Sequence, residues 1–476
     1  MKEVSYCDMP SILELIERLK LRHAGTWAAC SVSSRNKAKV PDDWARFVIA
    51  AVLACTVLIA ASLASERAPV RAPISAEQLD ALLNQKEYPE LSAALDNPDA
   101  RKSTDYEFFA GVVANRTNQL NRSIRMLKQA LPMLQKQRAY DREQIAWEIL
   151  ADGYASLGRY AEAADTYVAL ETHFGNRMSA REKAAMENEA RQWSLLRHVP
   201  PQSVAIAAAF TVPTKPNPLG LFEVPVEVRS ETRYWVVDTG ANISAMSKSE
   251  ARLLGLHPLE GTTEVKGVTG SMVPIQVAVV PELLLGKARL RNVAFVLLDD
   301  QNLLVSPPHY QIDGIIGYPV LSALGRITFD HNGTFAVDVS VKPHLRRGHN
   351  LFIEKETPLV AARIGDTTCL FTLDTGIRRT ILTARYYREH SSDFVAYKAN
   401  GQSLTGVGGT RSLPAYTIGT LSLQLAGHTT TLHDVPVLTN RAGKTFDDFC
   451  GTLGLDAVQQ FSAFTLDFHN MQLDLR

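Results

Sequence analysis

The sequence YWVVDTGANIS, Tyr234 to Ser244, decides the fold. An apolar run leads into Asp238, which Thr239 and Gly240 follow. Such a run before Asp and Gly is typical of a strand that ends in a turn. The carboxylate of Asp238 is then either an ordinary turn residue or one half of a catalytic pair of acids. In the second case, the other half lies elsewhere in the chain.

The same pattern occurs a second time as LFTLDTGIRRT, with Asp374 136 residues after Asp238 (374 minus 238). A glycine-rich stretch, typical of a hairpin tip, follows each copy. These stretches hold Gly267, Val268 and Gly270 in the first copy, and Gly406, Val407, Gly408 and Gly409 in the second. A short hydrophobic step before glycine comes next, with Ile315, Ile316 and Gly317 in one copy and Leu453 and Gly454 in the other. The order of these elements indicates an internal duplication.

Together, the repeated Asp-Thr-Gly, glycine-rich hairpin and apolar-Gly motifs resemble those of the retropepsin-type aspartic proteases. Each copy matches one retropepsin unit, and we expect lobe 1 at residues 221–342 and lobe 2 at residues 350–476. The resemblance implies two mainly-β lobes that form a single-chain pseudodimer, as in the pepsins. The expected fold class is therefore multidomain α plus β, since a helical region precedes the lobes.

In the family resembled, the two Asp-Thr-Gly loops meet at the lobe interface. The resemblance implies that Asp238 and Asp374 share one proton and activate a water molecule, because two close carboxylates do not both ionise easily. It implies that Thr239 and Thr375 hydrogen bond across the interface. It implies that Gly240 and Gly376 let the backbone pass close to the carboxylates. It also implies that the apolar-Gly segments pack behind the loops. The glycine-rich hairpins, or flaps, would close over an extended peptide.

The two copies diverge directly after the glycine of Asp-Thr-Gly. Ala241 and Asn242 follow in the first copy, and Ile377 and Arg378 follow in the second. The family usually has a small residue where Ile377 stands, so Ile377 is a candidate that narrows a substrate pocket. Arg378 either binds a substrate carboxylate or forms a surface salt bridge. These four residues are the candidates for asymmetric substrate selectivity.

The apolar segment at residues 47–64 is eighteen residues long (64 minus 47, plus 1) and carries no charge. It is either a transmembrane helix or a signal peptide. Basic residues precede it more densely than they follow it, which favours a cytoplasmic location for the short tail, residues 1–46, and places the lobes on the other side of the membrane. The expected protein is membrane-anchored or exported through residues 47–64, with an extracytoplasmic protease (periplasmic if bacterial).

Residues 76–197 are rich in helix-forming residues. Within them, large and small residues alternate at the spacing of a tetratricopeptide repeat: Trp147, Leu150, Ala151, Tyr154, Gly158, Tyr160, Ala163 and Tyr167. This TPR-like region is either an array that docks a protein partner or a plain helical spacer. Five prolines then mark a linker at residues 198–220.

Composition excludes several function classes. The chain has 50 Lys plus Arg and 50 Asp plus Glu, so no basic surplus indicates nucleic-acid binding. No nucleotide-binding glycine motif occurs, and neither the cysteines nor the histidines have metal-binding spacing. We therefore expect no cofactor and no metal. In the family resembled, the strands that carry Cys369 and Cys450 run side by side, so this pair is either a disulfide or two free thiols.

Three functions fit these patterns. The first is an aspartic endopeptidase that hydrolyses a peptide or protein substrate through the Asp238 and Asp374 pair. The second is a catalytically inactive, protease-like adaptor that binds peptides and uses its TPR-like region for docking. The third is an enzyme that releases itself from the membrane by cutting near residues 200–220.

Overall fold

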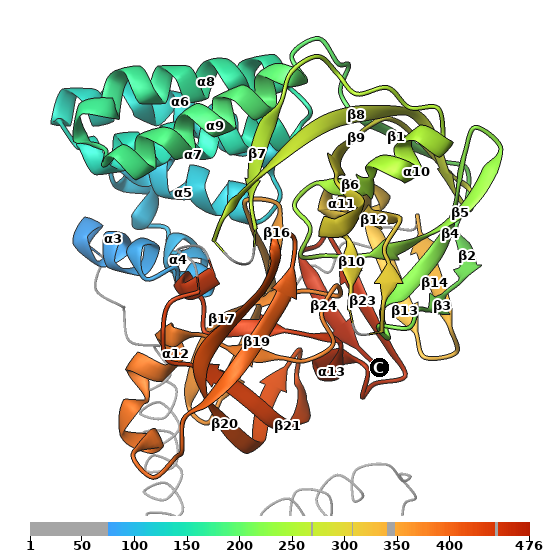
Figure 1. Ribbon diagram of the computed structural model, residues 1–476. Coiled ribbons are helices and arrows are strands. Elements are labelled where there is room, and N and C mark those ends of the chain that lie inside the picture. Colours follow the sequence, from blue (N-terminus) through green and yellow to red (C-terminus); the bar gives the residue numbers. More distant parts are fainter. Residues whose placement is uncertain (1–74, 268–269, 307, 340–347, 443–445) are drawn as a thin grey trace, which may run out of the picture. The chain divides into compact units, whose positions relative to one another are not determined.

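The computed structural model describes residues 75–267, 270–306, 308–339, 348–442 and 446–476, all within one compact unit, residues 73–476. The tail, residues 1–46, and the apolar segment, residues 47–64, lie outside the described residues. Within the described ranges, no helix is both long and apolar enough to cross a membrane. Helices occupy the first part and strands dominate the rest, so the fold is α plus β (Figure 1).

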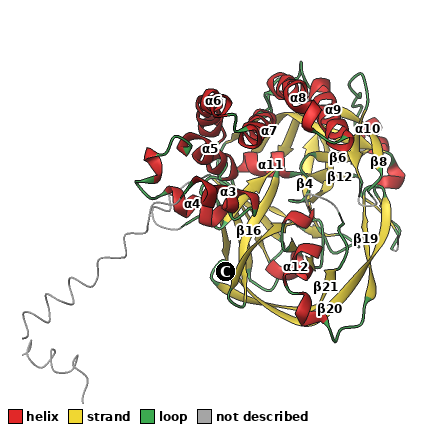
Figure 2. Ribbon diagram, turned by 90° about the vertical axis from the view of Figure 1, so that its left-hand side faces the viewer, coloured by secondary structure: helices red, strands yellow, loops and turns green. Residues whose placement is uncertain are grey.

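The helical region consists of consecutive α-helices joined by short turns: α3 (Ala76–Asn84), α4 (Tyr88–Leu95), α5 (Tyr106–Arg116), α6 (Leu120–Gln137), α7 (Tyr140–Ser156), α8 (Tyr160–Phe174) and α9 (Ala180–Leu195). Capping boxes at Ser75 and Ser179 begin the first and the last of them. Consecutive helices pack as antiparallel pairs, with Tyr154 and Tyr167 buried between them. Figure 2 shows these helices collected along one side of the strands. Their assignment as tetratricopeptide repeats stays a prediction.

Lobe 1 is built on one sheet with the strand order β1-β9-β6-β12-β5-β4-β8-β7, and β3 pairs with β4. The apolar alternation along β4 and β5 buries Val224, Val226 and Trp235 in the core. The short strand β12 lies parallel to β5 and places Ile316 beside Val237, directly before the first Asp-Thr-Gly. The bounds are β1 Ser203–Ile206, β3 Lys215–Pro216, β4 Phe222–Val228, β5 Glu231–Val237, β6 Ser244–Ser247, β7 Thr263–Lys266, β8 Met272–Leu285, β9 Ala288–Leu298 and β12 Gly314–Ile316.

Lobe 2 repeats this plan in a sheet with the order β15-β16-β17-β22-β18-β21-β20-β19. Here β22 lies parallel to β17 and places Leu453 beside Leu373, directly before the second Asp-Thr-Gly. A disulfide joins Cys369 of β17 to Cys450, which directly precedes β22. The bounds are β15 Leu351–Glu354, β16 Thr357–Ile364, β17 Thr367–Leu373, β18 Ile381–Leu382, β19 Asn400–Gly406, β20 Gly409–Leu425, β21 His428–Leu438 and β22 Gly451–Leu453.

Short helices complete the lobes: α10 (Lys248–Leu253) and α11 (Tyr318–Leu324) in lobe 1, and α12 (Ala384–Glu389) and α13 (Leu455–Val458) in lobe 2. A small hairpin of β10 (Leu304–Val305) and β11 (Tyr310–Gln311) lies apart from the main sheet of lobe 1. In both copies, the helix that follows the apolar-Gly motif leads into a strand that joins the lobes.

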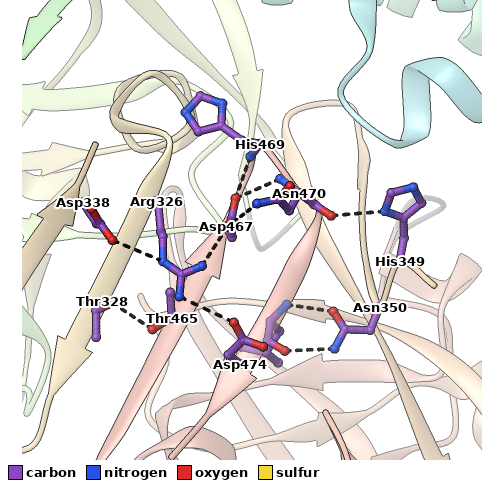
Figure 3. Close-up of polar contacts among 11 residues, drawn as sticks. Arg326, Thr328, Asp338, His349, Asn350, Thr465, Asp467, His469, Asn470 and Asp474 are labelled. Atoms are coloured by element: carbon purple, nitrogen blue, oxygen red, sulfur yellow. Dashed lines mark hydrogen bonds and ion pairs between the residues drawn. The ribbon is translucent and has the colours of Figure 1, made fainter. Parts of the chain in front are cut away.

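A five-stranded sheet with the order β2-β14-β13-β23-β24 joins the lobes. Strand β13 of lobe 1 pairs along its length with β23 of lobe 2, so Arg326 lies opposite Asp467. Arg326 donates a 2.8 Å hydrogen bond to the buried Asp467 carboxylate, and Thr328 bonds Thr465 at 2.8 Å (Figure 3). The bounds are β2 Phe210–Pro213, β13 Arg326–Asp330, β14 Thr334–Asp338, β23 Ala463–Asp467 and β24 Gln472–Leu475.

Residues 198–220, expected to form a linker, contribute strands to two sheets. Strand β1 pairs with β9 of lobe 1, and β2 pairs with β14 of the sheet between the lobes. Phe210 and Val212 of β2 are buried and alternate with exposed residues, because successive side chains of a strand point to opposite faces and only one face of β2 is covered. The prolines mark the ends of these strands rather than a free connection, so a cut near residues 200–220 would sever paired strands.

The helical region shares a hydrophobic core with lobe 2. Phe352, Leu359, Leu370 and Phe449 of lobe 2 pack into the same cluster as Leu91 and Phe108, among other helical residues. This packing anchors the helices to the sheet that carries the second Asp-Thr-Gly loop.

A buried ion cluster lies at this junction. Glu354 is 6% exposed and contacts Lys86 at 2.5 Å, Tyr88 at 2.7 Å and Arg116 at 3.8 Å. Burial alone would raise the pKa of Glu354, but the charges of Arg116 and Lys86 outweigh it and lower this pKa to about 2. The junction therefore holds an ionised carboxylate whose charged partners come from the helical region, Lys86 from the turn between α3 and α4 and Arg116 from α5.

Candidate active site

The two Asp-Thr-Gly loops end strands β5 and β17, as the sequence predicts for strand-to-turn transitions. The strands of the apolar-Gly motifs lie behind them. The backbone N–H of Asp238 donates to the Ile316 carbonyl at 3.0 Å, and that of Asp374 donates to the Leu453 carbonyl at 3.0 Å. Each aspartate is thus fixed at the end of an interior strand of its own sheet by the same backbone bond.

Reciprocal hydrogen bonds join the two loops across the lobe interface. The Thr239 hydroxyl donates to the Leu373 carbonyl at 2.6 Å and accepts from the Thr375 N–H at 3.0 Å. The Thr375 hydroxyl donates to the Val237 carbonyl at 2.8 Å and accepts from the Thr239 N–H at 3.1 Å. Both threonines are fully buried, so these four bonds do not compete with water.

Each aspartate carboxyl lies against the glycine of the opposite loop. A Cβ atom on Gly240 would come within 2.5 Å of the Asp374 Cγ, and one on Gly376 within 2.5 Å of the Asp238 Cγ. Contacts this short exclude any side chain at the two glycine positions. The glycines therefore let the two carboxyls lie close enough to influence each other's pKa.

The two carboxyls have unequal surroundings. Asp238 accepts hydrogen bonds from the N–H groups of Gly240 at 2.8 Å and Ala241 at 3.1 Å, and Asp374 accepts one from Gly376 at 2.8 Å. Burial raises the pKa of Asp238, while the bonds from Asp374 and the two N–H groups oppose this rise. Burial and the neighbouring charge of Asp238 hold the pKa of Asp374 well above its usual range. The two carboxyls therefore titrate as a pair, and the additional N–H donor at Asp238 gives a charge on that side the stronger support.

A hydroxyl group supports each apolar-Gly turn from behind. The Gly317 N–H donates to the Ser244 hydroxyl at 3.1 Å, and the Gly454 N–H donates to the Thr380 hydroxyl at 3.2 Å. Ser244 and Thr380 both stand six residues after their aspartates (244 minus 238 and 380 minus 374), which is the sequence signal for this role. In lobe 2, Thr380 also donates to Asp456 at 2.7 Å, a partner that the sequence did not indicate.

The four pocket candidates lie beside the loops in different surroundings. Ala241 is half-buried, and its carbonyl accepts a bond from Tyr318 at 2.8 Å, whereas the Asn242 side chain is exposed. Ile377 is half-buried, and Arg378 is exposed beside Gly220. The structure thus places the Ala241 N–H against the Asp238 carboxyl, while Asn242 and Arg378 are exposed.

The glycine-rich hairpins meet at their tips. Gly267 follows β7 of the first flap, and a Cβ on it would lie 2.5 Å from the Val407 carbonyl oxygen of the second flap. Gly270 closes the first tip by donating to the Gly267 carbonyl at 2.9 Å, and Val268 lies outside the described residues. In the second flap, Gly406 pairs with Gly409, and Gly408 has a left-handed backbone with φ of 86°.

Comparison with known families agrees with this geometry in lobe 1. Residues 224–320, from β4 into α11, match the sequence model of the aspartyl protease family. No curated protein matches the chain. Among the described residues, no group of His, Cys, Asp and Glu side chains is arranged to hold a metal ion. Lobe 1 is therefore similar in sequence to the aspartyl protease family, and the candidate site lies where the matched segment meets lobe 2.

Proposed function

We propose that the protein is an aspartic endopeptidase in which Asp238 and Asp374 activate one water molecule to hydrolyse a peptide bond. One observation carries the proposal: reciprocal threonine bonds hold the two Asp-Thr-Gly loops together, so that each carboxyl lies against the glycine of the other loop. The family match to residues 224–320 supports protease chemistry independently.

In the proposed reaction, Asp238 is ionised and Asp374 is protonated. Asp238 takes a proton from the water as its oxygen attacks the carbonyl carbon, and Asp374 donates its proton to the carbonyl oxygen. The tetrahedral diol then collapses and the C–N bond breaks, with one proton passing from Asp238 to the departing nitrogen. A second proton returns from the diol to Asp374, so that the products are a carboxylic acid and an amine.

The pKa values give the proposal a pH dependence. The pair works with one shared proton, so activity falls once both carboxyls ionise. Burial and the charge of Asp238 raise the pKa of Asp374. The singly protonated pair therefore persists above the pH at which an ordinary aspartate ionises, and activity extends from acid toward neutral pH.

The test is cleavage of a fluorogenic library of unstructured peptides by the full-length protein. Asp238→Asn and Asp374→Asn should each lower kcat by about a thousandfold or more, because either change removes the shared proton chemistry. A statine-type transition-state mimic should inhibit the wild-type protein. The matched control is Asp366→Asn, at an exposed turn before β17, which should leave kcat unchanged. Undiminished activity in either dyad variant would exclude this mechanism.

Two features of the rest of the chain enter the proposal. We propose that residues 47–64 anchor or export the protein, which places the lobes outside the cytoplasm. The Cys369–Cys450 disulfide supports this location, because such bonds persist in oxidising compartments. An alkaline phosphatase fused after residue 75 should be active, since that enzyme works only outside the cytoplasm. An inactive fusion at normal expression would contradict the export of the lobes.

The helical region is proposed to dock a protein substrate in the manner of tetratricopeptide arrays. Its antiparallel helix pairs and its shared core with lobe 2 support this role, since a docked protein would lie beside the lobes. The inactive Asp374→Asn variant should capture substrate proteins that the wild-type protein cuts. Partners that the wild-type protein also retains uncut would favour a peptide-binding adaptor instead.

A further inference from the structure

Strand β7 of the first flap is the last strand on its side of the lobe 1 sheet. Its neighbour β8 places Pro274 opposite Glu264. The Gly267 N–H donates to the Ser271 carbonyl at 2.8 Å, so in the alternating antiparallel pattern Glu264 and Pro274 form a non-hydrogen-bonded pair. The N–H and carbonyl of Glu264 therefore face the open edge of β7 and not β8. A free edge of this kind leaves backbone groups in need of partners from outside the sheet.

Asn188 of helix α9 supplies those partners. Its side-chain amide donates to the Glu264 carbonyl at 2.8 Å, and its amide oxygen accepts from the Glu264 N–H at 3.3 Å. The same oxygen accepts from the hydroxyl of Thr263 at 2.9 Å. One side chain thus pairs with both backbone groups of Glu264, as the next strand of a sheet would.

Apolar contacts surround this pairing. Trp193 and Leu195 of α9 pack with Val265 of β7 in one cluster, and Trp193 stacks on Tyr160 with ring centroids 5.8 Å apart. The helix is thus held against the lobe beside the residues that Asn188 contacts. Since β7 leads directly to Gly267, which meets Val407 of the second flap, the position of β7 bears on the contact between the flaps.

The second flap has no such partner among its side-chain hydrogen bonds within the described residues. Asn400 donates to Thr417 at 2.8 Å, Thr405 bonds Thr410 at 2.9 Å, and Arg411 donates to the Ala442 carbonyl at 3.3 Å. All of these bonds stay within lobe 2. The edge-strand contact of α9 described above therefore belongs to the first flap.

We propose that Asn188 is a positioning residue that holds the first flap strand against helix α9, so that the helical region sets the place of this flap over the substrate. The inference rests on the proposed peptidase function. Asn188 does not touch the reacting atoms. It acts through β7, and its loss should weaken substrate binding more than the chemical step.

Amide hydrogen exchange tests the tether without any need for activity. In full-length Asn188→Ala, exchange across residues 263–267 should be about tenfold faster than in the wild-type protein, because one or two backbone bonds lose their partner. Exchange across residues 400–406 should not change. Glu187→Ala, at the neighbouring exposed position of α9, is the matched control and should leave both segments unchanged. If Asn188→Ala left the exchange rate across residues 263–267 unchanged, or raised the rate across residues 400–406 equally, Asn188 would not hold β7 against α9.

Kinetics on a cleaved peptide test the positioning role. Asn188→Ala should raise KM by about fivefold and change kcat by less than about twofold, since it alters binding and not the dyad. Asn188→Asp keeps the acceptor but loses the donated bond to Glu264, so it should give an intermediate KM. A rise in exchange with no change in KM would overturn the positioning role. If the wild-type protein cuts no peptide but exchange changes as expected, the peptidase proposal fails while the tether stands.

Discussion

In lobe 1, an arginine and an aspartate face each other across the strands that support the first Asp-Thr-Gly loop, and in lobe 2 two cysteines occupy the matching positions. Arg233 and Cys369 both stand five residues before the aspartate (238 minus 233 and 374 minus 369). Asp313 and Cys450 both stand four residues before the apolar-Gly glycine (317 minus 313 and 454 minus 450). The first pair lies 3.7 Å apart as ions, and the second is a disulfide.

The difference shows that the two lobes share one strand arrangement but link the matching strands by different interactions. The lobe 2 tie is covalent and depends on the redox state, whereas the Arg233–Asp313 pair is partly exposed and weak. Arg233 instead makes its strong contacts with the buried Glu250, at 2.8 and 2.6 Å, and Trp235 also donates to Glu250 at 3.1 Å. Lobe 1 is thus stabilised through a buried acid and lobe 2 through a crosslink.

The largest effect should come from the disulfide. It closes a loop between residues 81 positions apart, and a loop of that size corresponds to about 4 kcal/mol of chain entropy in the unfolded state. The Cys369→Ala/Cys450→Ala variant should lose about that much free energy of unfolding in a urea titration followed by circular dichroism. A reductant should lower the stability of the wild-type protein and leave the variant unchanged. Equal stability of the two proteins would show that the crosslink contributes nothing.

The junction between lobe 2 and the helices should give the next effect, as a pH dependence. A fall of the Glu354 pKa from 4.5 to about 2 corresponds to about 3 kcal/mol. Since the pKa is lowered by folding, this stabilisation is complete above about pH 4.5 and is lost as the pH falls toward 2. Glu354→Gln should therefore be less stable than the wild-type protein at pH 6, and the gap should close by pH 2. A gap that is the same at both pH values would contradict the ionised state of Glu354.

The contrast also separates what the sequence could predict from what it could not. The second aspartate and the order of the motifs followed from local patterns that the chain repeats, whereas the threonine bonds across the interface followed only from the resemblance to the retropepsin-type proteases. The sequence also contained the information that Arg233 and Asp313 correspond to Cys369 and Cys450. Both pairs stand at the same number of residues before motifs that the sequence identifies. The cysteine pairing itself remained open, since spacing alone does not decide whether two adjacent thiols are oxidised.

Other features depend on contacts between distant parts of the chain. Asn188 and Glu264 are 76 residues apart (264 minus 188), and a lone asparagine on an amphipathic helix gives no signal of a strand partner. Strand β2 was missed because the five prolines of residues 198–220 outweighed the short alternation around Phe210. No local pattern marks the ion pairs of Glu354, because its partners Lys86 and Arg116 come from the helical region that precedes the lobes.

In lobe 1, Arg233→Met should lower the free energy of unfolding by about 2 to 3 kcal/mol, because it leaves the buried Glu250 carboxylate with only part of its hydrogen bonding. The double variant Arg233→Met/Glu250→Gln should recover part of that loss, since no buried charge then remains unpaired. Urea titrations of the single and double variants measure the difference. If the double variant is less stable than Arg233→Met, the charge of Glu250 is not the source of the loss.

The two lobes should differ least in the stability that each loses when its reciprocal threonine is replaced, because the two threonines make matching bonds. Thr239→Val and Thr375→Val each remove a hydroxyl that donates one buried bond and accepts another, so each should cost about 2 kcal/mol of unfolding free energy. The double variant should cost less than the sum, because both hydroxyls belong to one network. Thr410→Val, at an exposed position of β20, is the control and should cost little. If one of the two threonines cost far more than the other, the four bonds would not act as a symmetric pair, and the asymmetry between the lobes would extend to the loops themselves.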